Sequence, residues 1–299
     1  MRLNHNLASL NIYREHIKVF DNQSKALERI SSGYKINSAK DNPNAMASSE
    51  RMRMQIRGLQ IAQRNAQDGV SMLQTADGGL DSVTGMLQRI RELTVQAGSG
   101  SNTPSDMENI QMEINEMIEG MDSIVANTEF NGVSVLNPEE NPSVSYDNNH
   151  PAKKLIMTIG ANAGEKVEIP LYDISSNNLT DGTNSLRQLN TNVNPGDGVG
   201  GLGIDKAITI IDKAMETILS IRSKYGALSN RFESTYDKVA EIHDRITGAE
   251  SKIRDADIAE EMMEFAKNNV LVDSGHAMMV QSNKFPQDIL RILENVRSR

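Results

Sequence analysis

Apolar residues recur every seven positions between residues 204 and 253, and this is the most regular hydrophobic pattern in the chain. A second row follows three residues after the first, so steps of three and four alternate, with charged residues between them. This 3.5-residue repeat is typical of the seam of a left-handed coiled coil. The segment is therefore predicted to form one long helix that buries a narrow stripe against other helices. The first row comprises Ile204, Ile211, Ile218, Tyr225, Phe232, Val239, Ile246 and Ile253.

Three further segments carry the same repeat. Residues 3–34 have a weaker seam, and Gly33 is expected to break or cap that helix. Residues 44–97 have two rows rich in alanine and glycine, which allow partner helices to approach closely, and a further helix is predicted from Pro104 to about residue 127. The rows of the 44–97 segment are Leu59, Ala66, Leu73, Leu80 and Leu87, and Ala62, Gly69, Ala76, Val83, Ile90 and Ala97.

The heptads disappear over residues 137–201, where Asn, Pro, Gly, Ser and Asp are frequent. Two short alternating runs, 155–159 and 167–171, are predicted to be strands joined by a glycine-containing turn. A last helix is predicted to begin after Asp257, where a glutamate three residues on completes a capping-box pattern. Pro286 is expected to interrupt this helix before a final run over 289–296.

The predicted fold is mainly α, a long coiled-coil-like helical bundle made from N- and C-terminal segments, with a small β-containing variable insertion. We expect three parts: terminal helices 1–40 and 257–299, a helical rod formed by 41–136 and 202–256, and a surface-exposed insertion at 137–201. Each terminal helix has one narrow stripe, and an isolated pair of this kind is marginal in water. The stripes are therefore predicted to be covered by further copies of the chain. The predicted assembly seam comprises Leu3, Leu10, Ile17, Phe20, Leu27, Ile258, Met262 and Phe265.

The composition of the chain limits the classes of partner and site that it can have. The formal charge of −9 argues against nucleic acid or an anionic membrane surface as the main partner. No apolar run approaches the roughly 20 residues that span a bilayer, and the first residues lack the apolar core and cleavage site of a signal peptide. The chain has no cysteine, which excludes disulfides, thiolate metal sites and cysteine nucleophiles.

No residue pattern predicts a catalytic, cofactor or metal site. Residues 198–203 match G-x-G-x-x-G, but no buried strand precedes them, so we interpret them as a hinge. The five histidines never occur at i, i+3 or i+4 spacing, and no H-E-x-x-H motif of a zinc peptidase is present. The acidic residues Asp255, Asp257, Glu260 and Glu261 are explained by helix capping and dipole compensation. The pairs Met262–Met263 and Met278–Met279 are explained by adaptable packing at an interface.

Five segments outside the insertion form a combination of motifs: Ser31–Asp41, Arg64–Ser71, Phe130–Gly132, Ala227–Phe232 and Ser251–Asp257. Together they resemble bacterial flagellin. They occur in the family's order and flank a region that is variable in the family, which makes the combination more specific than any single motif. The resemblance covers roughly residues 1–137 and 202–299.

The resemblance implies a filament subunit located outside the cell in the bacterial flagellum, exported unfolded through the flagellar type III apparatus. The terminal helices would form the inner tube of a helical homo-oligomer, and the heptad rods its outer tube. The implied partners are a secretion chaperone at the C-terminal seam, the filament cap and junction proteins, and a host toll-like receptor. No cofactor, nucleic acid or membrane insertion is implied.

The resemblance also identifies receptor-binding positions. Arg89 and Leu93 match key positions in the flagellin segment that the flagellin-sensing toll-like receptor reads, and Glu113 on the next helix matches a third. Periodicity alone gives a simpler interpretation, in which Leu87 and Ile90 belong to the seam and Arg89 lies on a solvated face.

Two other functions stay open. A hook-associated protein of the hook–filament junction shares the terminal architecture, but it would cap or adapt a filament rather than form a long one. An enzyme that uses the insertion would need a catalytic constellation that the residues do not supply. A separate hypothesis concerns the small seam residues: close packing at Gly69 would allow the filament to switch shape, so Gly69→Leu is expected to block or lock it.

Overall fold

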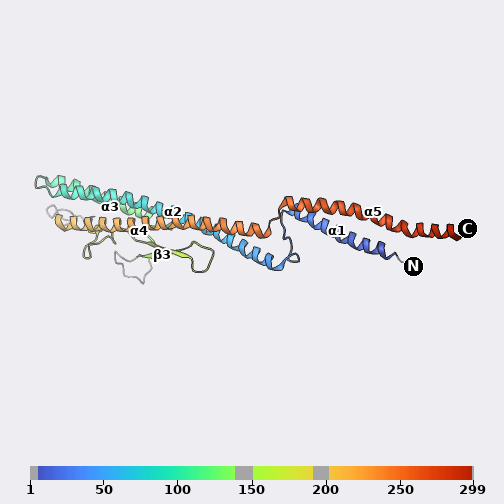
Figure 1. The fold of residues 1–299 in the computed structure, drawn as a ribbon. Helices are drawn as coiled ribbons and strands as arrows, with labels where there is room; N and C mark the ends of the chain where they lie inside the picture. Colours follow the sequence, from blue (N-terminus) through green and yellow to red (C-terminus); the bar gives the residue numbers. More distant parts are fainter. Residues whose placement is uncertain (1–5, 139–150, 191–201, 298–299) are drawn as a thin grey trace. The chain divides into compact units, whose positions relative to one another are not determined.

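The structure is a computed structural model that describes residues 6–138, 151–190 and 202–297. The chain forms two compact units: a terminal unit, made of Met1–Ile56 and Asp244–Arg299, and a bundle unit, made of Arg57–His243. Figure 1 shows the elements along the chain. The helices are α1 (Leu7–Ser32), α2 (Pro43–Ala97), α3 (Pro104–Asn127), α4 (Ile204–Arg254) and α5 (Ile258–Arg297), with a 3-10 helix, η1 (Leu186–Asn190). The strands are β1 (Glu129–Phe130), β2 (Val133–Ser134), β3 (Lys153–Thr158) and β4 (Lys166–Leu171).

The mainly helical fold predicted from the sequence is confirmed, and local capping explains where several helices begin or end. Gly33 ends α1 in the left-handed conformation at φ 73°, and its N–H donates to the Arg29 carbonyl at 2.8 Å. Thr103 and Asp106 form a reciprocal capping box at the start of α3. Hydrogen bonds from the hydroxyl and N–H of Thr103 hold the pKa of Asp106 below its usual range.

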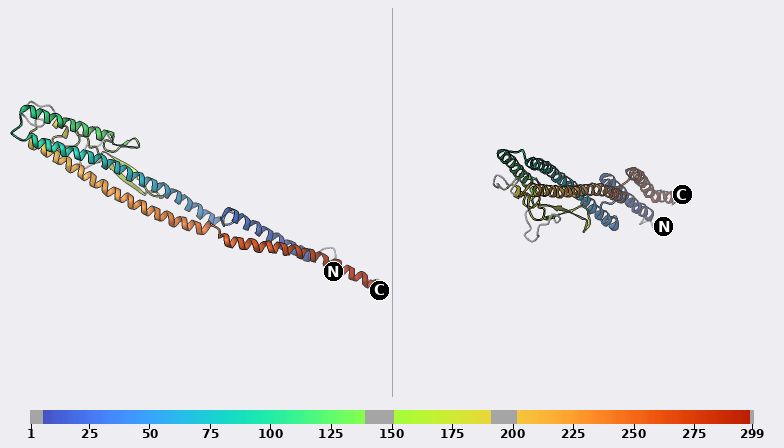
Figure 2. Two further views of the ribbon diagram at one scale, coloured as in Figure 1. Left: turned by 90° about the horizontal axis from the view of Figure 1, so that it is seen from above. Right: turned by 90° about the vertical axis from the view of Figure 1, so that its left-hand side faces the viewer.

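In the bundle unit, the heptad rows of α2 and α4 form the core together with α3. Figure 2 shows these three helices running side by side in the seen-from-above view. Every predicted row residue of α2 from Leu59 to Ala97 is buried, and the α4 rows are buried or half-buried from Ile204 to Val239. Gly69 lies against the ring of Phe232, and a Cβ atom at position 69 would come within 3.0 Å of Cε1 of that ring. The alanine and glycine positions of α2 thus permit the close approach that the sequence predicts.

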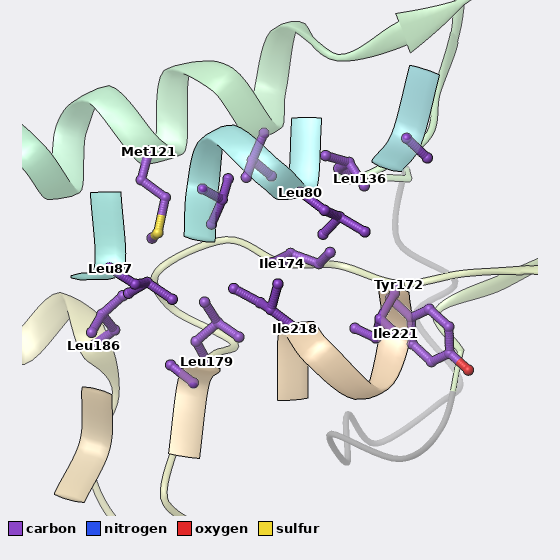
Figure 3. Close-up of a cluster of buried hydrophobic side chains, with 14 of the residues drawn as sticks. Leu80, Leu87, Met121, Leu136, Tyr172, Ile174, Leu179, Leu186, Ile218 and Ile221 are labelled. Carbon is purple, nitrogen blue, oxygen red and sulfur yellow. The ribbon is translucent and has the colours of Figure 1, made fainter. Parts of the chain in front are cut away.

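The described part of the insertion packs onto this bundle. β3 and β4 pair as an antiparallel hairpin with Leu155 opposite Ile169, which confirms the two predicted strands. Figure 3 shows side chains from the following segment, including Ile174 and Leu179, lying between those of the helices. Two polar contacts secure the segment: Asp122 accepts from the Ser176 N–H and hydroxyl at 2.8 and 2.6 Å, and the Tyr225 hydroxyl donates to a carbonyl of β4 at 3.0 Å. Residues 151–190 therefore contribute to the bundle core.

In the terminal unit, α1 packs along α5. The expectation that Pro286 interrupts the last helix is wrong, because α5 continues through it to Arg297. A proline lacks the N–H that would bond to the carbonyl four residues earlier, and here that carbonyl belongs to Ser282. Nδ2 of Asn6 donates to the Ser282 carbonyl at 2.9 Å and satisfies it. Oδ1 of Asn6 also caps α1 by accepting from the Ser9 N–H at 3.1 Å.

No helix among the described residues is both long enough and apolar enough to cross a membrane.

Candidate functional site

The contact between α1 and α5 follows a heptad spacing but contains many polar residues. Glu261 and Asn268 of α5 are 7% and 5% exposed. Three polar contacts cross the helix pair: Arg29 to Glu261 at 3.1 Å, Gln23 to Asn269 at 3.2 Å, and Asn6 to Ser282 at 2.9 Å. Such contacts fix the register of two helices, but they add little apolar burial. The rows that face each other are Ser9, Ile12, His16, Val19, Gln23 and Ala26, and Glu261, Phe265, Asn268, Val272, Gly275 and Met279.

The most apolar side of α1 does not face α5. Leu10, Ile17, Phe20 and Leu27 of the predicted assembly seam are 44%, 42%, 56% and 53% exposed, and they share one flank of α1 with Tyr13. Leu3, also predicted for this seam, lies outside the described residues. In this single chain the helix pair thus leaves its larger apolar surface uncovered.

The α5 residues of the predicted seam are of two kinds: some are exposed, and one lies in the contact with α1. Ile258 and Met262 are 46% and 52% exposed, whereas Phe265 is half-buried in the row that faces α1. Sequence reasoning assigned the Met pairs of α5 to adaptable packing but missed the other exposed apolar residues there, because together they follow no single heptad row. Large exposed apolar patches on a soluble chain mark interaction surfaces. The further exposed apolar residues of α5 are Met263, Val270, Leu271, Met278, Val280 and Phe285.

The structure brings two of the three predicted receptor-binding residues into direct contact. Nε and Nη2 of Arg89 donate to Oε1 of Glu113 at 2.8 and 2.6 Å, and Nη1 donates to Glu92 at 3.2 Å. These hydrogen bonds, with Glu113 contributing most, raise the pKa of Arg89. Leu93 is only 1% exposed and belongs to the bundle core. The surface at this place is therefore a hydrogen-bonded guanidinium–carboxylate pair that bridges α2 and α3.

One pair of residues escaped sequence reasoning completely. His16 of α1 and His276 of α5 are 260 positions apart, yet their ring centroids lie 4.4 Å apart at an interplanar angle of 68°. Only the pairing of α1 with α5 brings them together, so no spacing along the sequence could have indicated the contact.

The described residues contain no group of three or more His, Cys, Asp or Glu side chains arranged to hold a metal ion. Within the possible phosphate loop, Gly198, Gly200 and Gly201 lie outside the described residues, while Gly203 directly precedes α4 at φ 84°.

Comparison with known proteins gives consistent matches along the chain. The family model of the bacterial flagellin N-terminal helical region matches residues 3–140, and that of the bacterial flagellin C-terminal helical region matches residues 208–293. The chain is 38% identical over 308 residues to a flagellin of Bacillus subtilis and 35% identical over 293 residues to one of Halalkalibacterium halodurans. Each alignment covers 98% of this chain and 100% of the relative.

Among solved structures, a putative flagellar hook-associated protein from Vibrio parahaemolyticus is similar in fold. Its TM-score is 0.59 at 15% sequence identity, covering 72% of this chain and 100% of that one.

Proposed function

Because this chain belongs to the bacterial flagellin family, we propose that it is the structural subunit of a flagellar filament and that it polymerises through its terminal helices. Its role is mechanical rather than catalytic. The subunit is located outside the cell and contributes to motility as one copy in a helical homo-oligomer.

The observation that carries this proposal is the uncovered apolar flank of α1. Leu10, Tyr13, Ile17, Phe20 and Leu27 are each more than two-fifths exposed, although the sequence repeats them at coiled-coil spacing. Burying apolar surface contributes about 25 cal/mol per Å². Leaving this flank in water is therefore unfavourable, and packing against α1 or α5 of further copies removes the penalty. Filament assembly supplies such copies on every side of a subunit.

Electron microscopy of the concentrated, purified protein tests the proposal. We expect the full chain to form long tubular filaments in a salting-out buffer, which strengthens apolar burial. A variant without residues 1–40 and 257–299 should stay monomeric, because it lacks both terminal helices. Short caps from the full chain would instead support the hook–filament junction protein, and filaments from the truncated variant would contradict assembly through the termini.

Copy number separates the same two functions in cells. A filament subunit should greatly outnumber the basal-body proteins of one flagellum, whereas a junction protein should not. Quantitative mass spectrometry of isolated flagella measures this ratio directly, with the basal-body proteins as the internal standard.

We further propose that the chain is exported unfolded through the flagellar type III apparatus. Two features support this route. The chain has no cysteine, so no disulfide would obstruct the unfolded chain. The contact within its terminal helix pair is rich in polar residues and adds little apolar burial, so the pair is easier to unfold. On the same basis, a dedicated chaperone would cover α5 before export, and cap and junction proteins would contact the subunit afterwards. Co-purification from the cytoplasm should recover the chaperone with the full chain but not with a chain lacking residues 257–299.

The Arg89–Glu113 pair supports a second proposal, that a host toll-like receptor contacts the α2–α3 surface. Both side chains are accessible, at 47% and 40% exposure, and their hydrogen bonds hold them in one arrangement. Binding to side chains that are already held in place loses less conformational entropy than binding to side chains that must first be ordered. Leu93 is buried, so it would support this surface from within rather than touch the receptor.

For this surface we expect Arg89→Ala and Glu113→Ala each to reduce receptor activation at least about tenfold, as central charged contacts of interfaces commonly do. A reporter-cell assay with purified monomer measures the response. Arg91→Ala is the matched control, because Arg91 lies two residues away and makes a similar exposed pair with Asp212 at 2.8 Å. Equal losses in Arg89→Ala and Arg91→Ala would place the receptor contact elsewhere.

A further inference from the structure

His16 and His276 form a contact that filament assembly does not explain. Each imidazole projects from a different helix of the terminal pair, and the rings meet at a centroid distance of 4.4 Å. His16 occupies the α1 row that faces α5, where coiled-coil positions normally carry apolar side chains. A polar ring at such a position is costly unless it gains a partner.

The environment of His16 leaves one ring nitrogen without such a partner. Its Nε2 atom is buried and accepts or donates no hydrogen bond within the described part of the chain. The space for the ring comes from Gly275, since a Cβ atom there would lie 2.9 Å from Cδ2 of His16. Cδ2 is bonded to Nε2, so the absence of a side chain at Gly275 makes room for the part of the ring that carries the nitrogen without a partner. A buried polar atom that lacks a partner needs an explanation, and a bound ion is one such explanation.

We propose that His16 and His276 together bind one borderline divalent transition-metal ion, such as Ni²⁺, Cu²⁺ or Zn²⁺. Neutral imidazole is a preferred ligand of these ions. Two imidazoles that bind one ion at about 2.0–2.1 Å hold their ring centroids about 4.5 Å apart when the bonds meet at a right angle, and about 5 Å apart in a tetrahedral arrangement. The observed 4.4 Å is close to the right-angle value, so the spacing of the two helices already suits two imidazoles on one ion.

The two histidines have complementary accessibility. His276 is exposed, so an ion can reach its ring from solvent. The described residues offer no third His, Cys, Asp or Glu ligand at this place, so water would complete the coordination shell. The ion would connect α1 to α5 midway along α1, between the Asn6–Ser282 and Gln23–Asn269 contacts.

Calorimetric titration of Ni²⁺ into the full chain tests the site. The starting protein carries His5→Gln, His150→Gln and His243→Gln, so that the proposed pair supplies its only histidines. We expect one Ni²⁺ per chain, and an affinity at least about tenfold lower after either His16→Gln or His276→Gln. Equal affinity after both substitutions would overturn the site. A loss with His16→Gln alone would also overturn it, because that result assigns the effect to seam packing rather than to coordination.

Limited trypsin digestion gives a second, independent measurement. An ion that connects the two helices stabilises the paired state, so Ni²⁺ should slow cleavage within α1 and α5. The same addition should leave the His276→Gln variant unchanged. Ni²⁺ binding without slower cleavage would show that the rings bind metal separately, which contradicts a site across the two helices. Neither measurement requires polymerisation, so a failure here is independent of the proposed filament function.

Discussion

Phe20→Asp should prevent filament formation while leaving the free subunit folded. Phe20 is 56% exposed on the apolar flank of α1, so the single chain loses little when a carboxylate replaces the ring. In a filament, by contrast, the carboxylate would be buried without a partner. We expect the critical concentration for polymerisation to rise at least about 100-fold, equivalent to about 2.8 kcal/mol at about 1.4 kcal/mol per factor of ten. Sedimentation of polymer from a concentration series measures the change.

Asn22→Asp provides the matched control for this substitution. It introduces the same charge two residues away, at an exposed position on the polar side of α1. The critical concentration should then change by less than about threefold, since isolated surface charges contribute little. Equal effects of the two substitutions would mean that net charge, rather than the apolar flank, controls assembly.

Gly69→Leu should destabilise the bundle unit by about 3 kcal/mol, the upper end for overpacking a well-packed core. The leucine side chain would extend into the ring of Phe232, which is fully buried. Thermal unfolding of the purified subunit measures the loss. If the variant still polymerises, we expect filaments locked in one shape, visible as an altered waveform and reduced swimming.

Gly85→Leu is the matched control, because the same substitution at this position is expected to stabilise the subunit. A Cβ atom at Gly85 would meet nothing within 4 Å, and the residue is exposed on the same helix. Replacing a helical glycine at such a site should stabilise the subunit by about 0.5–1 kcal/mol. Stabilisation by both substitutions would show that helix propensity, and not the contact with Phe232, determines the result at position 69.

The helices could be predicted from the sequence in detail, because each is defined by a local repeat. All eleven predicted row residues of α2 between Leu59 and Ala97 are buried. The prediction failed at Pro286, where the outcome depends on a hydrogen bond from Asn6. A proline normally leaves a carbonyl unsatisfied, and whether a distant amide satisfies it cannot be read from neighbouring residues. The sequence analysis also did not predict that residues 151–190 pack onto the bundle, because this packing depends on contacts between residues that are far apart in the sequence.

For the candidate site, a heptad pattern reveals which residues share a helix face, but not what that face contacts. The apolar flank of α1 and the polar row that faces α5 both have coiled-coil spacing, and only the folded pair shows which is inside. The contact of Arg89 with Glu113 depends on how α2 and α3 are aligned, which the heptad repeat does not show. Neither the heptad repeat nor the family resemblance indicated the contact between His16 and His276.

The link between Asn6 and Ser282 makes the pairing of the terminal helices depend on segments at both ends of the sequence. The amide that satisfies the carbonyl freed by Pro286 comes from the N-cap residue of the first helix. A chain that stopped before residue 282 would still contain the whole bundle unit, yet α5 would lack about four turns and α1 would lose this hydrogen bond. We therefore expect such a chain to fold its bundle unit but to pair its terminal helices less stably than the full chain.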